Sequence, residues 1–162
     1  MSHISEESFE AALFKEDDLG SVIRVHLHIE HHVNEIINLL VPVPNSLKQL
    51  QLDYDGKVNL LCVLGVKPES IKVLSALGNM RNKFAHNLNY QLDESIVKNF
   101  YETLDGHSKE VLQKSYGELL SKDKHQDLDK YKKLTPRNKF IVIATVVKNM
   151  VLNIKFEITN SV

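Results

Sequence analysis

Apolar residues recur along most of the chain at spacings of three and four, which is the period of an amphipathic helix. This pattern predicts a short amphipathic helix within an N-terminal segment at 1–15, followed by a long helix over 17–41. Acidic residues at the start of the long helix suit the positive end of its dipole, and Pro42 and Pro44 end it. The apolar face of this helix consists of Val22, His26, Ile29, Val33, Ile36 and Leu40.

The rest of the chain shows the same period, interrupted by glycines, prolines and capping residues. Gly65 suits a helix C-terminus, Pro68 suits the first turn of the next helix, and Thr135 suits the cap of the last one. That last helix is apolar on nearly all sides, which predicts a place at the centre of a bundle or against a partner chain. A charged stretch over 122–134 is predicted to be an exposed linker. The predicted elements are a short segment over 46–52 and helices over 54–64, 68–88, 93–104, 108–121 and 137–156.

The helix predicted at 68–88 carries two unusual faces. Its apolar stripe runs Leu74, Leu77, Arg81, Phe84 and Leu88, so an arginine occupies a position that should face the core. A second face carries Ser75, Asn79, Asn82, His86 and Asn89. A solvated helix face normally carries Lys and Glu, so these uncharged side chains and the histidine indicate a polar site. The candidate binding residues are Asn79, Arg81, Asn82 and His86.

Arg81 and His86 lie five residues apart and therefore point about 140° from one another on a helix. One chain does not easily place both on one phosphate, whereas a two-fold pairing of two copies of this helix could form a shared cleft. There His86 would be the general acid or base of a metal-free RNA cleavage, and Arg81 would hold the phosphate. Asn82, the third catalytic candidate, would orient the phosphate or the histidine. Two other interpretations stay open: an ion pair between Arg81 and a buried acid, or a non-catalytic nucleotide or partner site.

The long N-terminal helix carries four histidines, of which His28 and His32 lie four residues apart and could clamp one metal ion, with Glu35 or His31 close by. No cysteine cluster and no HExxH pattern supports such a site. A solvated polar face with one core histidine, His26, explains the same residues. The sequence therefore predicts neither a metal site nor another cofactor.

Composition narrows the class of protein. A chain of 162 residues, 43% hydrophobic and 25% charged, is predicted to form a single domain over 1–162. A net charge of −1 argues against a polyelectrolyte binder of DNA, and no helix carries the basic face of a DNA reader. Without a membrane span or a signal peptide, the expected location is cytoplasmic. The single Cys62 lies in an apolar run and is predicted to be a buried thiol.

The spacing of Arg81, Asn82 and His86 resembles the motif of the HEPN superfamily, in which an Arg, often followed by Asn, precedes a His after four intervening residues. A wider order of segments is similar to the mannitol operon repressor family. These segments are 16–20 before the long helix, 57–65, the motif helix, and 137–140 at the start of the last helix. The likeness covers about 14–150 and is strongest over 57–87.

The resemblance implies an all-α, HEPN-like bundle of about five to seven helices, most simply a homodimer. It also implies a transcriptional regulator that lacks a DNA-binding module and acts through a partner protein. This hypothesis predicts a solvent-poor Arg81 held by an acid of the same chain, such as Glu35 or Asp18. The alternative is a metal-independent endoribonuclease of a toxin or defence system, with RNA as substrate and Arg81 and His86 in an open cleft at a dimer interface.

Overall fold

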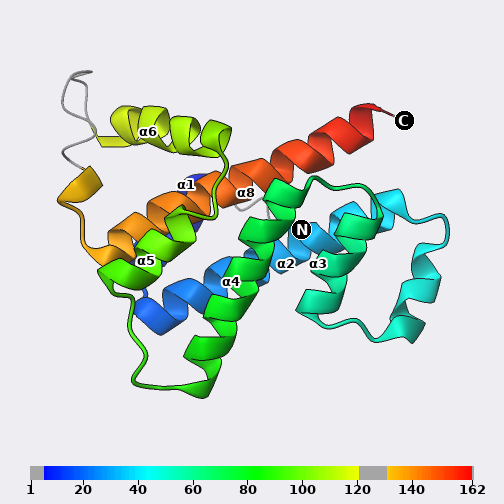
Figure 1. Cartoon of the computed structure of the whole chain (residues 1–162), viewed down its shortest axis with the longest axis horizontal. Coiled ribbons are helices and arrows are strands. Elements are labelled where there is room, and N and C mark those ends of the chain that lie inside the picture. Colours follow the sequence, from blue (N-terminus) through cyan, green and yellow to red (C-terminus); the bar gives the residue numbers. More distant parts are fainter. Residues whose placement is uncertain (1–5, 121–130, 162) are drawn as a thin grey trace.

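The computed structural model describes residues 6–120 and 131–161, and among these residues it contains helices and connecting segments but no strand (Figure 1). The prediction of an all-α bundle is confirmed. The helices, in chain order, are α1 (Glu6–Phe14), α2 (Asp18–Leu40), the 3-10 helix η1 (Pro44–Leu50), α3 (Tyr54–Val63), α4 (Pro68–His86), α5 (Glu94–Tyr101), α6 (Gly106–Leu120) and α8 (Pro136–Asn160). None of these described helices is long and apolar enough to cross a membrane.

The two longest helices, α2 and α8, lie side by side at the centre of the molecule and run in the same direction (Figure 1). Arg137 at the start of α8 donates to the carbonyl oxygen of Glu16 just before α2. Farther along both helices, Lys155 Nζ donates to Glu35 Oε2 over 2.8 Å. Because these links occur in the same order along both helices, α2 and α8 are parallel, and their buried faces supply nearly half of the described core.

Four of the described helices begin just after a residue whose side chain caps the first turn. The side chains of Asp17, Asp53 and Asp93 each accept a hydrogen bond from a backbone N–H in the first turn of α2, α3 and α5, respectively. Thr135 does the same for α8, with Pro136 in the first turn. Between α3 and α4, Gly65 adopts a φ of 97°, the left-handed conformation expected of a residue that follows a helix end.

Helix α4, which carries the Arg81 motif, is fixed against α2 and α3. The Tyr54 hydroxyl at the start of α3 donates to the carbonyl oxygen of Leu74 over 2.9 Å. One turn farther along α4, a Cβ on Gly78 would lie 2.7 Å from the Tyr54 ring. The glycine therefore allows the close approach of α4 to α3, and this contact sets the position of the motif.

Three sequence predictions need correction. Cys62 is exposed, because the buried face of α3 is Tyr54, Val58 and Leu61, and position 62 lies about 100° from position 61 on a helix. Leu88 is 88% exposed, because α4 ends at His86 and the chain leaves the helical path before this residue. Helix α5 ends at Tyr101, three residues before the predicted end.

The predicted linker over 122–134 falls mostly on residues 121–130, which lie outside the described residues. Of the remaining positions, Lys132 and Lys133 are exposed, as predicted, whereas Leu134 is half-buried. The segment therefore ends against the bundle just before α8 begins.

Candidate functional site

The motif helix α4 places Arg81 at the edge of the core. Its side chain is half-buried, and its Nη1 donates to the side-chain oxygen of Asn82 over 3.1 Å. No carboxylate forms an ion pair with Arg81 among residues 9–114 and 131–161. The expectation that Glu35 or Asp18 would hold this guanidinium is therefore wrong, because both acids face other groups. Glu35 pairs with Lys155 on α8, and Asp18 accepts from the backbone N–H of Leu92 over 2.9 Å.

The positive charge of Arg81 acts on a buried histidine of α2, His26. Burial lowers the pKa of His26 and the positive charge of Arg81 lowers it further, while Glu30 acts in the opposite direction. The His26 ring also packs on the Tyr54 ring, with 4.3 Å between their centroids. Arg81 thus lies near the junction of α2, α3 and α4, where a neutral histidine and a tyrosine fill the core.

The other motif residues face solvent. Asn79 and His86 are exposed, Asn82 is half-buried, and His86 lies in the last turn of α4. The imidazole of His86 makes no hydrogen bond or ion pair with any side chain that the structure describes. A single chain therefore brings Arg81 and Asn82 together but leaves His86 apart, as the helical geometry predicts.

Two cavities lie elsewhere on the molecule. One of about 360 Å³ lies beside α8 and includes Lys67, His107 and Asn153 in its wall. The other, of about 580 Å³, lies between α1 and α2 and includes Glu16, Arg24 and His28. Neither is lined by Asn79, Arg81, Asn82 or His86, so the motif forms part of the surface of α4 and not of these cavities.

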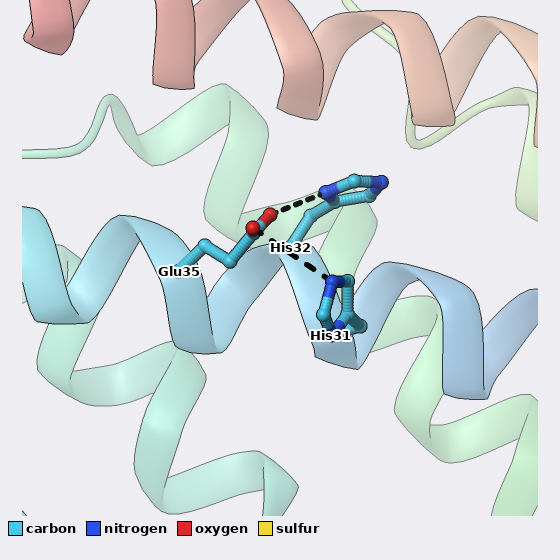
Figure 2. Close-up of side chains that lie close together, drawn as sticks. All are labelled: His31, His32 and Glu35. Carbon is cyan, nitrogen blue, oxygen red and sulfur yellow. Dashed lines mark hydrogen bonds and ion pairs between the residues drawn. The ribbon is translucent and has the colours of Figure 1, made fainter. Parts of the chain in front are cut away.

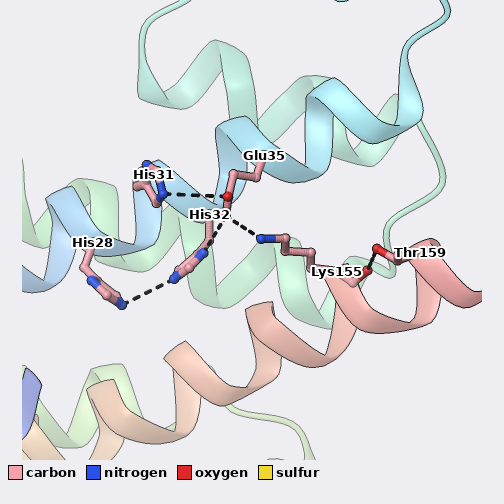
Figure 3. A network of polar contacts seen from close by, with 6 residues as sticks. All are labelled: His28, His31, His32, Glu35, Lys155 and Thr159. Atoms are coloured by element: carbon pink, nitrogen blue, oxygen red, sulfur yellow. Dashed lines mark hydrogen bonds and ion pairs between the residues drawn. The ribbon is translucent and has the colours of Figure 1, made fainter. Parts of the chain in front are cut away.

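A second polar cluster lies on α2, on the side that faces α8 (Figure 3). His32 Nδ1 is 2.8 Å from Glu35 Oε2, and His32 Nε2 is 3.3 Å from His28 Nε2. The other oxygen of Glu35 lies 3.8 Å from His31 Nε2, so the carboxylate lies between the two neighbouring histidines (Figure 2). Lys155 reaches the same carboxylate from α8.

The protonation of this cluster follows from its surroundings. Burial, followed by the neighbouring His32 and Lys148, lowers the pKa of His28 to about 4, so this imidazole is neutral near pH 7. Burial acts to raise the pKa of Glu35, but the hydrogen bonds from Lys155 and His32 outweigh it, and the pKa lies below its usual value. The cluster therefore combines a neutral imidazole with an ionised carboxylate.

Sequence reasoning missed one member of this region, Lys148. It is only 3% exposed on α8, and its Nζ lies 4.7 Å above the Phe9 ring and 3.9 Å from Glu10 Oε1. The available signal was a lysine directly after the apolar run that ends at Val147. Only the packing of α1 on α8 supplies its acidic partner.

No protein-family model matches the chain, and neither a curated protein nor a solved structure is significantly similar to it.

Proposed function

We propose that this protein is a small cytoplasmic transcriptional regulator of the mannitol operon repressor type, homodimeric, that acts by binding a partner protein. The acid of the same chain that this hypothesis predicted for Arg81 is absent among the described side chains, so the proposal now depends on the half-buried guanidinium that is left without an acidic partner there. A charged group at the edge of a core is normally paired. We infer that the acid that pairs with Arg81 belongs to the partner.

The surroundings of Arg81 suit a protein surface. One of its N–H groups donates to Asn82, and no other described residue accepts a hydrogen bond from the remaining donors, which can hold a carboxylate in a bidentate pair. Asn79 and His86 lie on other faces of α4, where they are exposed and can donate or accept hydrogen bonds. The exposed Leu88 follows the end of the helix and offers an apolar contact. Arginine is a frequent energetic centre of protein interfaces.

The proposal is tested by transcript measurement in the organism that carries the gene. Deletion of the gene should change the transcripts of a defined set of genes, and wild-type protein should restore them. Arg81→Glu should fail to restore them at equal protein level, because like charges would then face one another. Lys72→Ala, which removes an exposed cation from the same helix, is the matched control and should restore them. Unchanged transcripts after deletion would overturn the proposal.

A second candidate function is metal-independent RNA cleavage. The observation that favours it is the exposed imidazole of His86, which has no hydrogen-bond or ion-pair partner among the described side chains. Four residues separate His86 from Arg81 in the sequence. Such an imidazole is accessible to a substrate and can act as a general acid or base. A two-fold pairing of α4 would be needed to bring it to the Arg81 of the other copy.

Incubation of purified protein with RNA in EDTA separates the two candidates. Cleavage that resists EDTA and disappears in both His86→Ala and Arg81→Ala would establish the nuclease and displace the regulator. Absence of cleavage in the wild-type protein would remove the nuclease. Lys83→Ala, an exposed cation between the two motif residues, is the control for a general loss of positive charge.

A further inference from the structure

The histidine cluster on α2 brings the Nε2 atoms of two histidines close together. His28 and His32 lie one helical turn apart, and their Nε2 atoms face one another at 3.3 Å (Figure 3). Their rings are nearly perpendicular, with an interplanar angle of 81° and 4.9 Å between centroids. Both nitrogens therefore point at the same small volume beside α2.

The proton of His32 is fixed on the opposite side of its ring. Its Nδ1 lies 2.8 Å from Glu35 Oε2, and an ionised carboxylate can only accept a hydrogen bond. Nδ1 therefore carries the proton, and in the neutral ring Nε2 keeps its lone pair toward His28. A carboxylate behind an imidazole in this way is the usual outer contact of a metal-bound histidine, where it orients the ring and raises its basicity.

We propose that His28 and His32 bind one divalent first-row transition-metal ion, with Zn²⁺ as the representative, through their two Nε2 atoms. Zn–N bonds of about 2.0–2.1 Å in a tetrahedral site place two ligand nitrogens about 3.3 Å apart. The observed separation of the two Nε2 atoms is 3.3 Å, which matches the spacing of two ligand nitrogens in such a site. Water fills the remaining positions, and Glu35 stays the outer contact of His32.

A competing set of ligands exists in the same cluster. His31, His32 and Glu35 offer atoms that lie within 4.8 Å of one another (Figure 2). A spread of that size exceeds the edge of a tetrahedral zinc site, and Lys155 already occupies the Glu35 carboxylate. The side chain of His31 is also 68% exposed, and its Nε2 lies 3.8 Å from Glu35 Oε1, which is a long and weak contact. The His28 and His32 pair therefore requires the smaller rearrangement.

The two cations near the pair do not exclude a metal ion, because each faces its own acid. Lys155 lies 2.8 Å from Glu35, and Lys148 lies 3.9 Å from Glu10. An ion can approach from the cavity of about 580 Å³ between α1 and α2, since His28 forms part of its wall. The site thus has a route from solvent and no unpaired described cation beside it.

Calorimetric titration of the metal-free, full-length protein with Zn²⁺ alone tests the proposal. We expect one saturable site in the wild-type protein. His28→Ala and His32→Ala should each weaken binding by at least about tenfold, and Glu35→Gln should weaken it by about tenfold or more, as is usual for an outer contact. His31→Ala is the matched control, because it removes a neighbouring histidine of the competing set, and it should leave the affinity unchanged.

A second readout guards against variants that fold poorly. Titration of the wild-type protein with Co²⁺ should produce the visible absorption of a nitrogen-ligated ion. The double variant His28→Gln/His32→Gln should lack this absorption, while its circular dichroism spectrum should remain that of a helical protein. The proposal is overturned if the wild-type protein shows no saturable binding, in which case the two rings share only an N–H···N hydrogen bond. It is also overturned if His31→Ala abolishes binding and His28→Ala does not.

Discussion

At the scale of single residues, Arg81 is a half-buried cation whose Nη1 donates to the side-chain oxygen of Asn82. The interrupted stripe on α4 correctly indicated that Arg81 lies at the edge of the core, because helical periodicity is a local property. The proposed acid partners were wrong, because Glu35 is drawn to Lys155 on α8. That contact joins residues 120 positions apart, and no local pattern encodes it.

The environment of Arg81 predicts a small cost for its removal. We expect Arg81→Ala to lower the free energy of unfolding by about 1 kcal/mol, because the structure shows only one hydrogen bond to a neutral acceptor, on Asn82. Urea denaturation of the wild-type protein and the variant measures this difference. A loss of about 3 kcal/mol or more would indicate a buried ion pair and would contradict the structure.

His28 predicts how acid affects stability in the absence of metal. The pKa of His28 is about 4 in the folded protein and 6.5 ordinarily, so the unfolded chain binds more protons between these values. We therefore expect the free energy of unfolding in EDTA to be highest above about pH 6.5 and to fall as the pH drops toward 4. Urea denaturation over this range should show a weaker dependence for His28→Gln. An identical dependence in both proteins would contradict the assignment to His28.

At the scale of helices, most starts were predictable because caps are local. The predicted cap Thr135 accepts its backbone hydrogen bond, and Asp17, Asp53 and Asp93 cap α2, α3 and α5 in the same way. The orientation of Cys62 was not predictable, because the face of α3 that becomes buried depends on where α2 and α4 pack. The histidines of α2 were assigned mainly to solvent for the same reason, since α8 covers one side of them only in the folded chain (Figure 3).

The contact between α3 and α4 gives a prediction at this scale. Gly78→Ala should lower the free energy of unfolding by about 1–3 kcal/mol, because the new Cβ would lie 2.7 Å from the Tyr54 ring. Thermal and urea unfolding measure the change. Gly106→Ala is the matched control, since nothing lies within 4 Å of its Cβ position, and it should be neutral or slightly stabilising. Equal effects of the two substitutions would contradict the close approach of α4 to Tyr54.

At the scale of the whole molecule, the fold class followed from the sequence while the arrangement did not. Helical periodicity predicted an all-α bundle, and the apolar character of the last helix predicted a place either at the centre of the bundle or against a partner chain. The structure shows α8 at the centre, packed along α2. The parallel course of α2 and α8 had no signal in the pattern, because it depends on contacts between distant segments.

The proposed function predicts the mass of the particle in solution. Light scattering after size-exclusion chromatography should give twice the chain mass of 18.5 kDa, because the proposed regulator is a homodimer and a shared cleft needs two copies of α4. A mass of one chain at all concentrations would contradict the dimer and would also remove the mechanism of the alternative nuclease. Leu88 is exposed just after the end of α4. Leu88→Ser should therefore weaken the dimer only if the interface includes this end of α4.

The packing of α2 against α8 also affects the order in which the core can form during synthesis on the ribosome. Helix α2 is synthesised early, but α8, which packs along much of its length, is the last of the described elements to be made. Contacts between segments so distant in sequence form late and slowly. The part of α2 that α8 covers therefore stays exposed until α8 has been synthesised, whereas α3 and α4 can cover the rest of α2 earlier.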